Sequence, residues 1–408
     1  WGATGLVGTL GLKFTNFAIQ NLFNPESYRI VPQGEGQTFS INARTNGVYY
    51  TSASMSFLEP WLGGKRPNSL SANIFFASQT GYSDRYYQAY QNLYNTYYNY
   101  YAYSGNSNYL QQLQESEADP DKYLRTFGVS IGYGKRLSWP DDYFSFYGEL
   151  SYQMYMMKDW PYMILTDGMS HNLALNLQIS RSSIDNPIYT RRGSQFTLGL
   201  KITPPYSLIK GTTDAQYAQM TNSEKYNLLE YHKWRFSGKV FTPLSADSKL
   251  VLMARAEFGY LGHYNKNAKS PFESFYMGGD GMSSYSSYST EYVAMRGYQS
   301  GSLTPYDPAT GRNMGYVYNK FTMELRYPIA LEQNATIWAL AFVEAGNCFA
   351  DIKDYNPFNL KRSAGVGVRL FLPMFGLMGI DWGWGFDPIN GSNSYGGSQF
   401  HFVLGQEL

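Results

Sequence analysis

The chain has 408 residues, of which 43% are hydrophobic, 18% aromatic and only 15% charged. Its 32 basic and 31 acidic residues nearly balance, so no global field draws it towards nucleic acid. A membrane-spanning helix needs about 20 consecutive apolar residues, and the best candidate run, residues 337–343, is far shorter. These features argue against a nucleic-acid-binding protein and against a helical membrane protein.

Strict alternation of apolar and polar residues is the strongest signal along the chain. In residues 172–180, the apolar side chains Leu173, Leu175, Leu177 and Ile179 share one face and polar side chains take the other. This period predicts strands with one apolar and one wet face. It recurs in four further segments, residues 39–44, 196–202, 250–258 and 320–326.

The sequence therefore predicts an all-β protein of about sixteen strands. In chain order we place them near residues 3–11, 12–20, 37–46, 49–58, 68–79, 124–136, 143–157, 171–180, 194–203, 233–242, 248–262, 316–327, 335–346, 361–372, 378–386 and 398–405. A soluble β-sandwich also alternates. Charges of both signs on the polar face, and connections that alternate between short and long, favour a transmembrane antiparallel β-barrel with long extracellular loops, a single domain over residues 1–408.

Three long connections are predicted to lie on the extracellular side. The first, residues 84–122, is rich in Tyr, Asn and Gln and has no apolar period; an amyloid-like segment is the alternative reading. The others span residues 208–231 and 265–315. The short turn at residues 139–143 then faces the periplasm.

No feature of the sequence indicates catalysis or a cofactor. Residues 128–132 match the Gly-x-Ser-x-Gly pattern by letter, but they lie within an alternating strand rather than a strand-to-helix turn. The four histidines are scattered, and the lone Cys348 offers no metal-ligand spacing with them. We predict no enzyme, no metal and no cofactor; the histidines are His171, His232, His263 and His401.

Two segments of the third long connection form a recognisable pair. An aromatic and glycine-rich segment, which contains Phe275, Tyr276, Gly278 and Gly279, is followed by the tetrad Met295, Arg296, Gly297 and Tyr298. The pair resembles the signature of the BamA family, in which a Val-Arg-Gly-Phe/Tyr tetrad lies at the tip of the sixth extracellular loop. Here Met295 stands in the place of the usual Val. Residues 57–64 and 181–193 also resemble that family, so the likeness runs along essentially the whole chain.

The resemblance implies acidic partners for Arg296. Residues 342–346 look like the family's Phe-x-Asp-x-Gly strand with Glu344 for Asp, and Glu324 occupies the inward acidic position of the preceding strand. A guanidinium can make planar, bidentate contacts to carboxylates, so such a pair would hold the loop in one pose. The alternative is that Arg296 is a solvated loop residue and Glu344 merely lines a wet pore.

The two ends of the chain are predicted to form a lateral gate. The first predicted strand contains Gly5, Gly8 and Gly11, and glycine is a poor strand former. Near the other end, Phe400 and Phe402 are placed on the lipid face and Gly405 can kink the closing strand. The terminal aromatic that usually ends an outer-membrane assembly signal is replaced by Leu408.

The BamA-family resemblance implies an outer-membrane insertase that folds barrel proteins through this gate. Its expected partners are unfolded outer-membrane β-barrel clients, accessory outer-membrane lipoproteins and the lipid bilayer, with no nucleic acid, and POTRA domains are expected upstream. A secretion or diffusion pore, such as a two-partner secretion transporter or a TamA-like translocation protein, is the alternative, because a barrel of this size can hold an aqueous channel.

Overall fold

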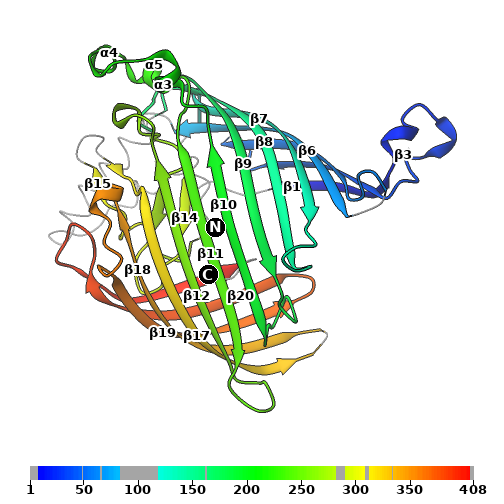
Figure 1. Ribbon diagram of the computed structural model, residues 1–408, viewed down its shortest axis with the longest axis vertical. Coiled ribbons are helices and arrows are strands. Elements are labelled where there is room, and N and C mark those ends of the chain that lie inside the picture. Colours follow the sequence, from blue (N-terminus) through cyan, green and yellow to red (C-terminus); the bar gives the residue numbers. More distant parts are fainter. Residues whose placement is uncertain are drawn as a thin grey trace, which may run out of the picture. The chain divides into compact units, whose positions relative to one another are not determined.

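The computed structural model describes residues 8–47, 49–64, 67–82, 118–160, 163–281, 290–307, 312–332 and 334–404. Long strands dominate the chain, and the helices are short (Figure 1). Within these described ranges, no helix is both long and apolar enough to cross a membrane.

Among the described residues, fifteen strands form one antiparallel sheet in the order in which they follow along the chain. The predicted all-β class and most of the predicted strand positions are confirmed. The strands are β1 (Gly8–Phe17), β4 (Gln37–Thr45), β5 (Tyr50–Glu59), β6 (Asn68–Tyr82), β7 (Ala118–Arg136), β8 (Phe144–Lys158), β9 (Gly168–Ser182), β10 (Gly193–Ile202), β11 (His232–Pro243), β12 (Val251–Gly262), β17 (Val317–Leu331), β18 (Thr336–Phe349), β19 (Lys361–Leu372), β20 (Gly376–Pro388) and β21 (Tyr395–Leu404).

Two strand predictions are wrong in detail. Residues 3–11 and 12–20 do not form two strands: one strand, β1, runs through the predicted boundary, because Leu10, Leu12 and Phe14 continue one alternation with no turn residue between them. Strand β7 begins at Ala118, inside the predicted loop 84–122, because backbone pairing continues beyond the apolar pattern. The rest of that loop, residues 84–117, lies outside the described residues.

The described residues form two compact units. The first contains residues 1–133, 149–174 and 212–229, and the second contains residues 134–148, 175–211 and 230–408. In the first unit an apolar row crosses four neighbouring strands, because Leu12 pairs with Ile41, Ile41 with Met55 and Met55 with Ile74. All four side chains are exposed. The alternation thus turns one apolar face outward, as it does in a membrane barrel.

The second unit has a buried core at one end of its strands. Val251 and Met253 on β12 pack with Phe241 on β11 and Trp338 on β18. Tyr189, from the connection between β9 and β10, places its ring 5.7 Å from that of Trp338. The inner side of these strands is therefore filled by side chains at this end.

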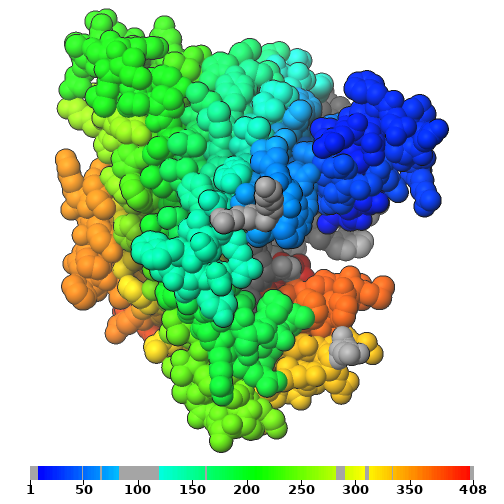
Figure 2. Space-filling view, turned by 45° about the vertical axis from the view of Figure 1, so that its right-hand side comes forward, coloured from blue at the N-terminus to red at the C-terminus, as the bar shows by residue number. Residues whose placement is uncertain are grey.

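Some connections carry structure of their own. The predicted loop 208–231 overlaps three short helices, α3 (Tyr206–Lys210), α4 (Asp214–Gln219) and α5 (Asn222–Lys225). Both α4 and α5 begin with a capping box, at Thr213 and Thr221. Residues 18–36, which we call the β1–β4 connection, contain η1 (Ile19–Asn21), η2 (Pro25–Ser27), β2 (Tyr28–Arg29) and β3 (Val31–Pro32) and stand out beyond the ends of β1 and β4 (Figures 1 and 2).

Candidate functional site

The connection between β12 and β17 folds back on itself. We call residues 263–316 the lock loop. Its short strands β13 (Phe275–Met277) and β14 (Glu291–Val293) pair in parallel, and an isolated bridge joins Gly279 to Met295. The Met295 amide donates to the Gly279 carbonyl at 3.0 Å, and the Gly279 amide donates to the Tyr298 carbonyl at 3.0 Å. The two segments singled out from the sequence are therefore hydrogen-bonded to each other.

Arg296 is completely buried and is surrounded by carboxylates. Its Nη2 donates to Glu324 on β17 and to Glu344 on β18, both at 2.8 Å. Its backbone amide and Nε also donate to Glu344, at 2.9 and 3.1 Å. A third carboxylate, Asp381 on β20, accepts from Nη1 at 3.3 Å. The guanidinium carbon lies 3.6 Å from the centre of the Phe342 ring, a cation–π contact.

The carboxylates around Arg296 are themselves shared with other cations. Glu324 accepts from Arg326 at 2.6 Å, Asp381 from Arg369 at 2.7 Å, and Glu344 pairs with Lys320 at 3.1 Å. Burial by itself would lower the pKa of Arg296, but Glu344, Glu324 and Asp381 outweigh burial and raise it. We call these residues and Arg296 the arginine cluster. It fixes the lock loop to three strands of the second unit.

Gly297 and Tyr298 complete the attachment. Gly297 has φ +83°, and an added Cβ would lie 2.8 Å from the Gly385 amide nitrogen. Its own amide donates to His401 Nε2 on β21 at 2.8 Å. The buried Tyr298 donates its hydroxyl proton to the Arg362 carbonyl on β19 at 2.9 Å. A larger residue at 297 would therefore separate the loop from β20.

The aromatic and glycine-rich segment packs within the same loop. Phe275 is fully buried, its ring 4.7 Å from that of Tyr318 on β17, and Tyr276 contacts Tyr292 with ring centres 5.3 Å apart. Gly278, at φ +127°, is so close to its neighbours that a Cβ would meet the Gln299 carbonyl oxygen. These residues support the fold of the lock loop rather than the contact of Arg296.

A second charged attachment holds the loop to β10 and β11. Glu273 accepts from Lys201 Nζ on β10 at 2.5 Å and from Lys233 Nζ on β11 at 3.0 Å. Lys233 also pairs with Glu291 at 2.8 Å, and Arg235 pairs with Glu291 at 2.9 Å. Burial of Glu273 opposes its charge, but the two lysines hold its pKa at about 2. No motif in the sequence singles out Glu273, so this attachment was not predicted.

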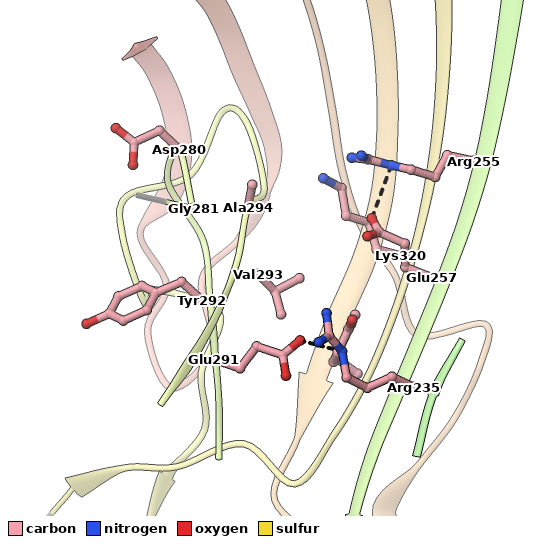
Figure 3. Close-up of a pocket in the computed structure, with 11 residues that line it drawn as sticks. Arg235, Arg255, Glu257, Asp280, Gly281, Glu291, Tyr292, Val293, Ala294 and Lys320 are labelled. Carbon is pink, nitrogen blue, oxygen red and sulfur yellow. Dashed lines mark ion pairs between the residues drawn. The ribbon is translucent and has the colours of Figure 1, made fainter. Parts of the chain in front are cut away.

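A small polar cavity of about 180 Å³ lies between the loop and the strands. Figure 3 shows Arg235, Arg255, Glu257 and Lys320 along its strand side and Glu291 on its loop side. The Arg255 Nε lies 3.2 Å from a Glu257 carboxylate oxygen. The lining carries charges of both signs, so this cavity is polar and charged rather than an apolar ligand pocket.

The structure brings together Arg296, Glu324 and Glu344, three residues singled out from the sequence. Asp381 and His401, which also contact the tetrad, were missed. A signal for Asp381 was present, because it is the inward-facing acid in a strand whose neighbours Ile380 and Trp382 point outward. His401 likewise alternates with outward aromatic residues.

Four of the six residues assigned to the gate lie on the two strands that end the sheet order. Gly8 and Gly11 are on β1 and pair with Thr45 and Asn42 of β4. On β21, Phe400 and Phe402 pair with Trp382 and Ile380 of β20, and both side chains are exposed. Gly5 and Gly405 lie outside the described residues. The role of these residues in a gate stays a prediction.

The Omp85 superfamily domain matches residues 33–408. No curated protein matches the chain. BamA from Haemophilus ducreyi, in a form lacking POTRA domains 1–3, superposes with a TM-score of 0.61 at 16% identity, covering 98% of this chain and 67% of that one.

CdiB from Escherichia coli is also similar, with a TM-score of 0.54 at 9% identity. The match covers 98% of this chain and 59% of the CdiB chain, so this chain spans less than two thirds of that protein. At these identities the likenesses establish the fold, which is the barrel fold of BamA and CdiB.

Proposed function

Since the chain belongs to the Omp85 superfamily, we propose that it is the barrel of a bacterial outer-membrane insertase, which folds client β-barrel proteins into the membrane. The observation that carries the proposal is the buried arginine cluster, because it seats a long loop against the inner faces of β17, β18 and β20. A simple diffusion pore needs an open lumen and has no use for such an attachment.

The apolar outer face of the strands supports the proposal that the protein is an integral outer-membrane protein. The exposed row from Leu12 to Ile74 in the first unit has its counterpart in the second, where Phe321, Met323 and Leu325 alternate along β17 and are exposed. Lipid offers no hydrogen-bond partners, so only structures whose backbone groups are paired can cross it. Strands with apolar outer faces meet that requirement when their edges are paired.

The proposed mechanism uses a strand edge rather than covalent chemistry. A seam between the first and last strands would open, and its backbone groups would pair with an incoming client strand. The edge would supply the hydrogen bonds that lipid cannot offer and so lower the barrier to insertion. A disulfide that ties the first strand to the last should abolish activity and leave the barrel folded; full activity of the crosslinked protein would contradict the gate.

The direct experiment is the folding of an unfolded outer-membrane protein in vesicles that contain the full-length protein. Faster client folding than in protein-free vesicles, without steady solute leakage, is the expected result. Accessory outer-membrane lipoproteins are proposed partners, and their addition should increase the rate further. No acceleration, together with steady solute conductance, would contradict the insertase.

A secretion pore is the second candidate, and the similarity to CdiB favours it. The two functions share the fold and differ in what crosses or enters the membrane. A secretion pore would release a soluble passenger into the vesicle exterior and would leave the folding rate of barrel clients unchanged. The same vesicles therefore distinguish the two proposals.

A further inference from the structure

The β1–β4 connection exposes large apolar side chains to an unusual extent. Phe23 is 97% exposed and Ile30 is 90% exposed. Ile19, Leu22 and Tyr28 in the same connection are also exposed. Several large exposed apolar side chains within one short connection indicate a surface that meets a protein or a membrane. In Figure 2 this segment stands out from the strands that it joins.

The connection is internally hydrogen-bonded. The Ala18 amide donates to the Pro32 carbonyl at 3.0 Å, and the Gln33 amide donates to the Ser27 carbonyl at 3.1 Å. The Tyr28 hydroxyl donates to the Leu22 carbonyl at 2.7 Å. These backbone groups are thus paired within the connection, while its large apolar side chains are exposed. That arrangement is what a segment requires if it is to enter lipid, where water cannot satisfy the backbone.

Ile30 occupies a conformation that its side chain does not favour. It lies at the turn between β2 and β3, where Arg29 pairs with Val31, and its φ is +82°. A β-branched residue rarely adopts this region, and Gly or Asn would be less strained there. Strain of this kind concentrates at functional positions. The turn has an isoleucine at its tip although glycine or asparagine would adopt this backbone conformation with less strain.

The connection also continues the apolar outer face of the strands. Phe17, at the end of β1, packs its ring 5.1 Å from that of Phe39 on β4 and 6.2 Å from that of Phe57 on β5. Phe39 shares a face with Ile41, and Phe57 shares a face with Met55, in the exposed row described above. The buried Phe17 therefore packs against residues of the outer face at the point where the chain leaves β1.

We propose that the β1–β4 connection inserts into the bilayer interface through Phe23 and Ile30; this inference rests on the proposed outer-membrane function. Its three charged residues, Glu26, Arg29 and Glu35, are all exposed, so their side chains can reach headgroups and water. The backbone hydrogen bonds within the connection and the continuity with the outer apolar row favour lipid over a protein partner. The connection acts as a wedge in the bilayer beside the first strand.

The test places an environment-sensitive fluorophore on the connection. Cys348 is buried, so Phe23→Cys and Ile30→Cys can be labelled selectively with NBD in the full-length protein. The matched control is Asp247→Cys, an exposed site in the connection between β11 and β12. Unlabelled wild type checks that Cys348 does not react. Each protein is reconstituted into phosphatidylethanolamine and phosphatidylglycerol vesicles, with and without lipids that carry a nitroxide below the headgroups.

Insertion to a depth of about 5–10 Å predicts blue-shifted emission and about twofold or greater quenching by nitroxide lipids at positions 23 and 30, and little of either at position 247. Emission and quenching at positions 23 and 30 equal to those at 247 would overturn the proposal. Shielding of these positions only after accessory lipoproteins are added would also overturn it and would assign the surface to a protein.

The readout is independent of client folding. Quenched labels in a protein that does not accelerate client folding would leave the lipid contact intact and reject the insertase. Unquenched labels in a protein that does accelerate folding would reject the lipid contact alone.

Discussion

The inward faces of β17, β18 and β20 carry five buried charged side chains, namely Lys320, Glu324, Arg326, Glu344 and Asp381, whereas the inward side chains of β4, β5 and β6 are mainly short and uncharged. Lys320 and Glu324 on β17 are buried and paired with partners on other elements. Asn42 on β4 instead faces Ser54 on β5, and Asn73 on β6 reaches Ser130 on β7 through one hydrogen bond of 3.4 Å.

The two inner faces therefore tolerate different neighbours. Buried charges must be paired to be tolerated, so the charged face accepts the one loop pose that supplies Arg296. The short, uncharged side chains on the inner face of β4, β5 and β6 need no such partners. These strands are held together by backbone pairing and by the outer apolar row. We therefore expect the charged region to be the fixed part of the protein and the β1–β6 region to open more readily.

Removal of a shared carboxylate should break the charged region most severely. Glu344→Gln removes one of the three carboxylates around Arg296 and also the carboxylate that pairs with Lys320, and we expect it to destabilise the protein by about 3–5 kcal/mol. Denaturant unfolding of the refolded protein measures the change. The matched control is Glu332→Gln, an exposed glutamate in the connection after β17. Equal stabilities of the two variants would show that the cluster is not a structural anchor.

A side chain at position 297 should push the loop off β20. Gly297→Ala combines a positive φ with a contact that has no room for a Cβ, so we expect a cost of about 1–3 kcal/mol. Gly391→Ala is the control, because Gly391 has a similar φ of +74° and nothing within 4 Å of the added atom. The difference between the two unfolding free energies isolates the contact. If the two variants lost the same stability, the close packing of the tetrad would be refuted.

Acid should weaken the attachment of the loop to β10 and β11. The pKa of Glu273 is about 2 in the folded protein, below its ordinary value, so its charge stabilises the fold above the ordinary pKa. This contribution is lost as the pH falls from the ordinary pKa towards about 2. We expect wild type to be more stable than Glu273→Gln near neutral pH and the difference to shrink on acidification. A difference that does not change with pH would contradict the ion pairs with Lys201 and Lys233.

A substitution on the uncharged inner face of β4, β5 and β6 should lower the stability of the protein least. Asn73→Ala removes one hydrogen bond to Ser130, and we expect a loss of about 0.5–1.5 kcal/mol. Unfolding under the same conditions as for Glu344→Gln gives the comparison. If Asn73→Ala lost as much stability as Glu344→Gln, the predicted difference between the two regions would be contradicted.

The sequence could predict the strands because their alternation is strict. Leu173, Leu175 and Leu177 place β9 correctly, whereas β7 begins earlier than predicted because residues near Ala118 have no apolar period. The helices α4 and α5 were missed although Thr213 and Thr221 begin capping boxes that the sequence contains. Short helices bury too little apolar surface to leave a periodic pattern.

The candidate site was predictable only where a resemblance singled out residues. Arg296, Glu324 and Glu344 came from the tetrad and the strand motif. Asp381 and Glu273 did not, because their contacts join residues far apart in the chain, Asp381 with Arg296 and Glu273 with Lys201. Alternation places a residue on a face, but it does not say which residues of distant strands and loops meet there.

The central claim is that the seated lock loop is required for client insertion. Its most direct test is the folding rate of an unfolded barrel client in vesicles that contain wild type, Arg296→Ala or the exposed-arginine control Arg192→Ala, at equal amounts of folded protein. We predict that the control matches wild type and that Arg296→Ala loses most of the acceleration. Full acceleration by a folded Arg296→Ala protein would contradict the account.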